Sequence, residues 1–159
     1  MELDNKILET LMNSSINSFP VFSLKGYITF AKVLENYDGD TADIFINYNG
    51  TFMRLKARFY GYDSPEMKPS MNIPNRDEIK KKAIEAKRRL WELCSGLPKL
   101  DEKIHKKLIK VVCDDFDKYG RILITAFEKK EDEGFELSIN KKMINEGHGY
   151  AYYGGHKET

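Results

Sequence analysis

The 159-residue sequence predicts an α+β, β-rich fold in which a five-stranded barrel is accompanied by two to three helices. Three observations predict it: short segments of alternating apolar residues, an Asn49-Gly50 pair between two of them, and a long amphipathic segment after the third. Apolar residues make up 41% and charged residues 32%, which is typical of one folded globular domain. We expect an N-terminal extension over residues 1–24 and a folded domain over residues 25–155.

The five expected strands are short, rich in β-branched or aromatic residues, and bounded by turn residues: 27–34, 41–48, 51–60, 108–113 and 122–127. Asn49-Gly50 favours a tight turn between the second and third strands, because both residues tolerate a positive φ. Residues 61–75 contain three prolines and are expected to form a loop.

Three helices are expected, over residues 3–12, 76–94 and 138–147. The middle one has an apolar stripe and several basic residues on its other faces, and Ser138 is expected to cap the last one. Five strands with one helix after the third match the connectivity of an OB-type barrel. This connectivity completes the predicted fold class.

The first helix carries an apolar stripe that includes Leu3, Ile7, Leu8 and Leu11. We expect it to pack back onto the barrel through the polar linker 13–20. Two alternatives stay open. The stripe can dock on a second copy of the chain and form a dimer, or the helix can remain a frayed arm.

Charge and apolar content limit the classes of function. The sequence has 26 Lys+Arg and 25 Asp+Glu, a net charge of +1, so nucleic-acid binding requires a local basic patch. No run of 18 apolar residues and no signal-peptide pattern is present, so we expect an intracellular protein without membrane association. Cys94 and Cys113 lack metal-binding spacing and are expected to be buried thiols, with one disulfide as the alternative.

Three charged segments fall at expected turns: Asp38-Gly39-Asp40-Thr41, Asp63-Ser64-Pro65-Glu66 and Asp117-Lys118-Tyr119-Gly120-Arg121. Phosphodiester hydrolysis needs a hard cation on oxygen ligands, a carboxylate that orients or deprotonates water, and cationic groups that hold the phosphate. Carboxylates at 40, 63 and 66 and arginines at 58 and 121 are suitable groups. Taken singly, each segment is an ordinary turn. Their joint occurrence in this order indicates a site.

Together these segments resemble the staphylococcal nuclease (thermonuclease) family over about residues 26–153. The resemblance implies that Asp40, Asp63 and the Ser64 carbonyl bind Ca²⁺, with Mg²⁺ or Mn²⁺ as alternatives. It implies that Glu66 is a general base or orients water, and that Arg58 and Arg121 hold the phosphate, with Arg54 as a rival for Arg58. Further residues are expected at the metal or along the bound nucleic acid: Asp38, Lys68, Lys118, Tyr119, Tyr152 and Tyr153.

The function implied by the resemblance is hydrolysis of DNA or RNA with low sequence specificity, single strands preferred, leaving 3′-phosphates. The alternative is a non-catalytic OB-fold module that binds nucleic acid or another protein. We expect a monomer, with dimerisation through the N-terminal helix as the alternative state.

Overall fold

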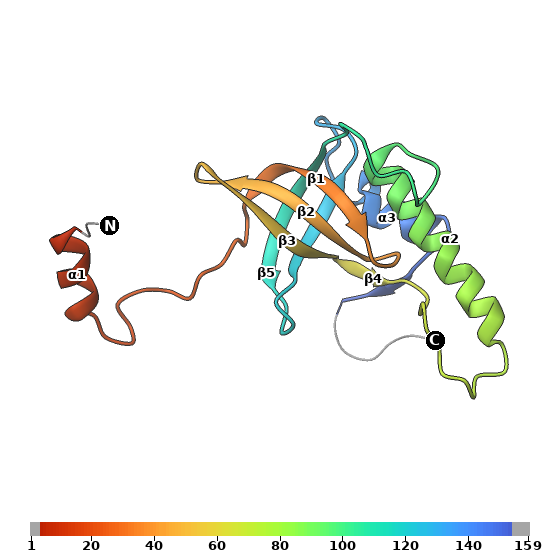
Figure 1. The fold of residues 1–159 in the computed structure, drawn as a ribbon, viewed down its shortest axis with the longest axis horizontal. Helices are drawn as coiled ribbons and strands as arrows, with labels where there is room; N and C mark the ends of the chain where they lie inside the picture. The colour runs from red at the N-terminus through yellow and green to blue at the C-terminus, as the bar shows by residue number, and fades with distance from the viewer. Residues whose placement is uncertain (1–3, 154–159) are drawn as a thin grey trace.

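The computed structural model describes residues 4–153 of the chain. Its centre is a closed barrel of five strands in the order β1-β2-β3-β6-β5, and β4 and β7 form a small sheet beside it (Figure 1). The predicted α+β, β-rich fold with a five-stranded OB-type barrel is confirmed. The strands are β1 Ile28–Asn36, β2 Thr41–Tyr48, β3 Thr51–Phe59, β4 Gly61–Asp63, β5 Ile109–Phe116, β6 Ile122–Phe127 and β7 Tyr150–Tyr152.

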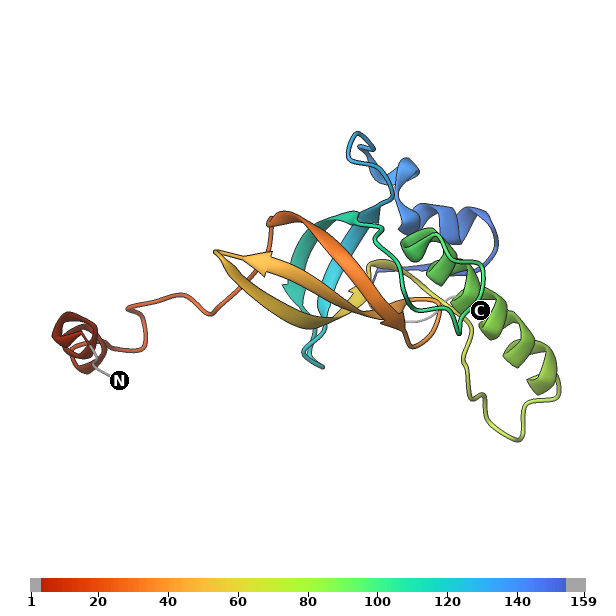
Figure 2. The ribbon, with the colours of Figure 1, turned by 45° about the horizontal axis from the view of Figure 1, so that its top comes forward.

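The described helices are α1 Asn5–Met12, α2 Arg76–Ser95 and α3 Ile139–Asn145, with a 3₁₀ turn, η1, at Phe135–Leu137. All three α-helices lie where the sequence predicts helices. The Ser138 hydroxyl accepts a hydrogen bond from the Lys141 N–H at 3.0 Å, which confirms the predicted cap. The helices α2 and α3 pack together against one end of the barrel, on the side away from α1 (Figures 1 and 2).

The barrel is built from the antiparallel strands β1–β2–β3 and the hairpin β5–β6, which are joined by antiparallel pairing of β1 with β5 and by parallel pairing of β3 with β6. Asn49 and Gly50 have φ values of 49° and 84°, which confirms the predicted tight turn between β2 and β3. At its end β3 leaves β2 and pairs in parallel with β6, with Ala57 opposite Ile122 and Arg58 opposite Leu123. This parallel contact closes the barrel.

Side chains along the strands alternate between the barrel interior and its outside. Ile44 and Ile46 of β2 are buried inside, and the helix α2 covers one end of this core with Ala86, Leu90 and Trp91. Cys94 and Cys113 are free and buried, as predicted for the thiols.

Two short strands were not predicted. The strand β4 lies in a segment expected to be loop, and β7 lies in the aromatic C-terminal region. The two pair antiparallel, with Gly61 opposite Tyr152 and Asp63 opposite Tyr150. A three-residue strand shows no recognisable alternation, because its extended shape is set by a partner distant in sequence.

The packing predicted for the N-terminal helix was wrong. The helix α1 has no buried residue and lies apart from the barrel at the end of an extended linker (Figures 1 and 2). The chain reaches the barrel at Phe22, which contacts the rings of Tyr48 and Phe116, and at Leu24, which is buried. Leu3 and the last two residues of the expected domain, Gly154 and Gly155, lie outside the described residues. Within residues 4–153, no helix is long and apolar enough to cross a membrane.

A buried asparagine fastens α3 to the barrel. The Asn140 side-chain amide donates to the carbonyls of Tyr60 and Ile124 at 2.8 and 3.0 Å, and its oxygen accepts from the Ala126 N–H at 2.9 Å. These three bonds satisfy backbone groups at the β3–β4 junction and in β6. The residue is fully buried, so these bonds are shielded from solvent.

We predict that Asn140→Ala lowers the free energy of unfolding by about 2–5 kcal/mol, because the Tyr60 carbonyl and the Ala126 N–H lose their hydrogen bonds to Asn140 together. Urea unfolding followed by circular dichroism measures the change. Asn145→Ala is the control, since Asn145 is exposed at the end of the same helix. Equal stability of the two variants would contradict the role given to Asn140.

Candidate active site

The barrel brings the three charged segments to one place. Thr41 begins β2 directly after Asp40, and it pairs with Arg58 of β3. One turn after β3, β4 ends at Asp63. The third segment connects β5 to β6, and β6 lies beside the end of β3. Residues from four strands therefore surround the point where the barrel closes.

Arg58 is the centre of the site. Its guanidinium forms an ion pair with Asp40, Nη1 to Oδ2 at 3.3 Å, and a second one with Asp63 through Nη2. The side chains of Arg58, Asp40 and Asp63 are only 11%, 10% and 12% exposed. One buried cation thus pairs with two buried carboxylates. Removing these three charged groups from water opposes folding, and the ion pairs and the hydrogen bonds around them offset that cost.

Backbone and hydroxyl donors fix the orientation of Asp40. Its Oδ1 accepts from the Thr41 hydroxyl at 3.1 Å, and its Oδ2 accepts from the Ser64 N–H at 2.8 Å. Asp38 supports the same turn, because its Oδ1 accepts from the N–H groups of Asp40 and Thr41 at 3.0 and 2.8 Å. Burial and the neighbouring charge of Asp40 raise the pKa of Asp38 to about 7.

Gly39 allows this turn to pack closely on its surroundings. A Cβ atom at Gly39 would lie 2.7 Å from the Ser64 Cβ and 2.8 Å from the Ala86 Cβ in α2. The Gly39 carbonyl accepts a hydrogen bond from the buried Tyr62 hydroxyl at 2.7 Å. Any larger residue would push the Asp38–Thr41 turn away from Asp63 and Arg58.

The turn before β6 holds Arg121 in a similar way. Asp117 Oδ1 accepts from the N–H groups of Tyr119 and Arg121, both at 2.9 Å, and its Oδ2 accepts from Arg121 Nε at 2.7 Å. Burial alone would raise the pKa of Asp117, but the hydrogen bonds and the charge of Arg121 outweigh burial and lower it. Asp117 is therefore the anionic partner that positions Arg121.

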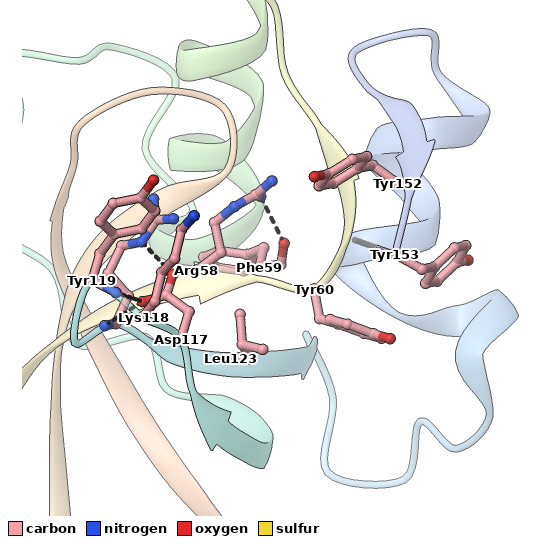
Figure 3. A pocket seen from close by; sticks show the side chains of 11 residues that line it. Arg58, Phe59, Tyr60, Asp117, Lys118, Tyr119, Leu123, Tyr152 and Tyr153 are labelled. Carbon is pink, nitrogen blue, oxygen red and sulfur yellow. Dashed lines mark hydrogen bonds and ion pairs between the residues drawn. The ribbon is translucent and has the colours of Figure 1, made fainter. Parts of the chain in front are cut away.

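Arg58 and Arg121 line the same cavity of about 280 Å³ (Figure 3). The other lining residues are Phe59, Tyr60, Gly61, Asp117, Lys118, Tyr119, Leu123, Tyr152 and Tyr153.

The tyrosines around this cavity differ in orientation. In Figure 3 the Tyr152 ring is turned toward the Arg58 side chain, whereas the Tyr153 ring is turned away. Tyr153 instead makes an edge contact with Tyr60, with 5.5 Å between ring centroids. Tyr119 is largely exposed, and both Lys118 and Arg121 place cationic groups over its ring. Tyr152 and Tyr119 therefore offer ring surfaces to a ligand beside the arginines.

Of the residues expected at the site, six line the cavity: Arg58, Lys118, Tyr119, Arg121, Tyr152 and Tyr153. The other six do not line it, and of these Asp40 and Asp63 adjoin it through their ion pairs with Arg58. Glu66 and Lys68 are exposed on the loop after β4, and Asp38 lies behind Asp40 in its turn. Ser64 is buried next to Asp40. Arg54, the alternative to Arg58 as the phosphate-binding residue, lies on β3 two positions before Lys56. It pairs with Asp43.

Sequence reasoning did not assign roles to five residues that line the cavity: Phe59, Tyr60, Gly61, Asp117 and Leu123. The interval of four residues between Asp117 and Arg121 is a signal for an ion pair across a turn. Leu123 follows Arg121 by two residues, and alternation along β6 therefore places it on the same outward side. Tyr60 has no such signal, because its position depends on the break between β3 and β4.

Asp40 and Asp63 carry the type of oxygen ligand that a hard divalent cation prefers. Among residues 4–153, no group of three or more His, Cys, Asp or Glu side chains is arranged to hold a metal ion. Two buried carboxylates, Asp40 and Asp63, nevertheless converge on the single positive charge of Arg58. Carboxylate oxygens are the ligands that Ca²⁺ and Mg²⁺ prefer, and such ions also bind backbone carbonyls and water. Asp40, Asp63 and the Ser64 carbonyl are the residues that would hold it.

Comparisons with known proteins add no family assignment. No family model matches the chain, and no curated protein matches it. The geometry of the site and the resemblance of its motifs are therefore the basis of the functional proposal.

We predict that Arg58→Gln lowers the free energy of unfolding by about 3–5 kcal/mol in metal-free buffer, because two buried carboxylates lose their cation. The control is Arg54→Gln on the same strand, where the ion pair is exposed and little change is expected. Thermal or urea unfolding measures both. An Arg58→Gln protein as stable as the control would show that the buried ion pairs do not hold Asp40 and Asp63 in place.

Proposed function

We propose that this protein is a metal-dependent nuclease that hydrolyses phosphodiester bonds of DNA or RNA with little sequence specificity. The observation that carries the proposal is the joining of Asp40 and Asp63 by Arg58, at a cavity that Arg121 also lines. The resemblance of the three charged segments to staphylococcal nuclease supports the same chemistry.

The two arginines are suited to bind the phosphate. Each guanidinium is planar and can donate two parallel hydrogen bonds to phosphate oxygens. Arg58 comes from β3 and Arg121 from the turn before β6, so they approach the cavity from different elements. Negative charge grows on the oxygens as phosphorus becomes pentavalent, and two fixed guanidinium groups stabilise it without reorientation.

The carboxylates provide the cation site. Asp40 and Asp63 would hold a divalent cation, which would supply positive charge beside the phosphate oxygens and make water more acidic. Charge balance favours this arrangement, because two carboxylates face one arginine. The hydrogen bonds from Thr41 and Ser64 hold Asp40 in place before a ligand binds.

In the proposed reaction, the oxygen of water bonds to phosphorus and the bond from phosphorus to the 5′-oxygen breaks. The leaving oxygen takes a proton, and the products carry a 5′-hydroxyl and a 3′-phosphate. Glu66 is the candidate that accepts the proton of water. It is exposed on the loop three residues after Asp63, so this assignment depends on the motif resemblance rather than on its position.

A second candidate function is a non-catalytic nucleic-acid-binding module. One observation favours it: the ion pairs of Arg58 with Asp40 and Asp63 can hold the loop together without any role in hydrolysis. The cavity with Arg121, Lys118 and the tyrosines would then bind phosphate and base only.

We predict that the protein cuts single-stranded DNA in buffer with Ca²⁺ and that chelation stops the reaction. Asp40→Asn should lower the rate at least about a hundredfold while the circular dichroism spectrum stays that of the folded protein. Asp101→Asn is the control, because the Asp101 carboxylate is exposed and distant in sequence from Asp40. Cutting by Asp40→Asn at nearly the wild-type rate would contradict the metal assignment. Binding without cutting in Ca²⁺, Mg²⁺ and Mn²⁺ would favour the non-catalytic module.

We also predict that Arg121→Lys lowers kcat by about a hundredfold or more, because a lysine cannot reproduce two parallel hydrogen bonds to a phosphate. Arg88→Lys in α2 is the control, since Arg88 is exposed and outside the cavity. Steady-state cleavage and thermal melting are measured together. A variant with a lower melting temperature and an unchanged kcat would show that Arg121 only stabilises the turn with Asp117.

A further inference from the structure

Two phenylalanines on the β2–β3 hairpin are exposed and do not belong to the barrel core. Phe45 and Phe52 are 45% and 82% exposed, whereas Ile44 and Ile46 of the same hairpin are buried inside. Alternation along each strand places both rings on the outside of the barrel. The hairpin extends away from α2 and α3, so these helices do not cover it (Figures 1 and 2).

Basic side chains alternate with these rings across three strands. Phe45 lies directly between Lys32 of β1 and Arg54 of β3. Along β3, Phe52, Arg54, Lys56 and Arg58 occupy every second position and so share the outward side. We call the surface formed by Lys32, Phe45, Phe52, Arg54 and Lys56 the outer face of β1–β3.

The outer face of β1–β3 leads directly to the candidate active site. Arg58 follows Lys56 by two positions and pairs with Thr41, next to the metal-site residue Asp40. Phe52 and Arg58 are six positions apart along β3, a distance of about 20 Å. A ligand bound on the rings and at Arg58 together must therefore be a chain of several units.

The charges of this surface favour an anionic ligand. Arg54 pairs with Asp43 at 2.6 Å and lies 3.7 Å from Glu35, which neutralises this part of the surface. Lys32 and Lys56 form no ion pair with any residue in the described range 4–153, so their ammonium groups remain available to a ligand. Exposed aromatic rings separated by cationic groups are the surface that single-stranded nucleic acids bind, through stacked bases and paired phosphates.

We propose that the outer face of β1–β3 binds a single-stranded polynucleotide and guides it to Arg58, with bases stacked on Phe45 and Phe52 and phosphates at Lys32 and Lys56. This site is separate from the cavity lined by Arg121 and the tyrosines. Its role as a guide to the reacting phosphate rests on the proposed nuclease function, whereas binding itself does not. Other OB-type barrels bind oligonucleotides on the face of their second and third strands, which agrees with this placement.

The test is the affinity of the full-length protein for fluorescein-labelled dT12, measured by anisotropy in the presence of chelator, so that no cleavage occurs. The double variant Phe45→Ser/Phe52→Ser should bind at least tenfold more weakly than the wild type, because two stacking surfaces are lost. The control Phe19→Ser removes an exposed ring in the N-terminal linker and should bind like the wild type. Circular dichroism and melting establish that the double variant is folded.

A second variant tests the electrostatic part. Lys32→Gln/Lys56→Gln should reduce the slope of log affinity against log salt concentration by about 1.4, since each contact of a single strand with a phosphate contributes about 0.7. An unchanged slope would refute the contacts proposed for the two lysines.

Failure of this inference differs from failure of the proposed function. Equal dT12 affinity of the double variant and the wild type overturns the inference, even if the wild type cleaves dT12 in Ca²⁺. Weaker binding by the double variant supports it, even if no protein cleaves dT12. Sedimentation is measured on the same samples. If the double variant turns a wild-type dimer into a monomer and leaves dT12 affinity unchanged, the face is a contact between copies of the chain, which also overturns the inference.

Discussion

The parallel pairing of β3 with β6 is the constraint on which the rest of the molecule depends. It closes the barrel, and it does so at Arg58, whose neighbour in β6 is Leu123. The same pairing therefore closes the core and brings Arg58 and Arg121 to one cavity. Asn140 reinforces this junction by binding the carbonyls of Tyr60 and Ile124 from α3. The candidate site and the closure of the barrel therefore depend on the same strand pairing.

Charged groups at this junction are held in place before any ligand arrives. Asp40 accepts hydrogen bonds from Thr41 and Ser64 and pairs with Arg58, and Asp117 fixes Arg121 in the same manner. Burying these groups opposes folding, and the network offsets that cost only while all its members are present. Groups fixed in this way need no reorganisation when charge develops on a bound phosphate, which is the property that such sites require.

The sequence predicted the parts of the fold that depend on local patterns. Alternation identified five strands, Asn49-Gly50 identified the hairpin, and Ser138 identified the start of α3. Arg58, Arg121 and the tyrosines expected at the site line one cavity, and for the two arginines this follows from strands that the barrel makes neighbours. Local patterns could not reveal β4, β7 or the position of α1, since each depends on a partner distant in sequence or on the lack of one.

The two buried thiols allow local opening of the fold to be followed by chemical modification. Cys94 lies in α2 and Cys113 in β5, and burial raises the pKa of both, that of Cys113 to about 11. A thiol reagent attacks only the deprotonated, accessible sulfur, so neither residue reacts while its element stays in place. The modification rate of Cys94 follows the loosening of α2, and that of Cys113 follows the separation of the barrel strands. The native protein therefore allows the loosening of α2 and the separation of the barrel strands to be measured independently, without an introduced label.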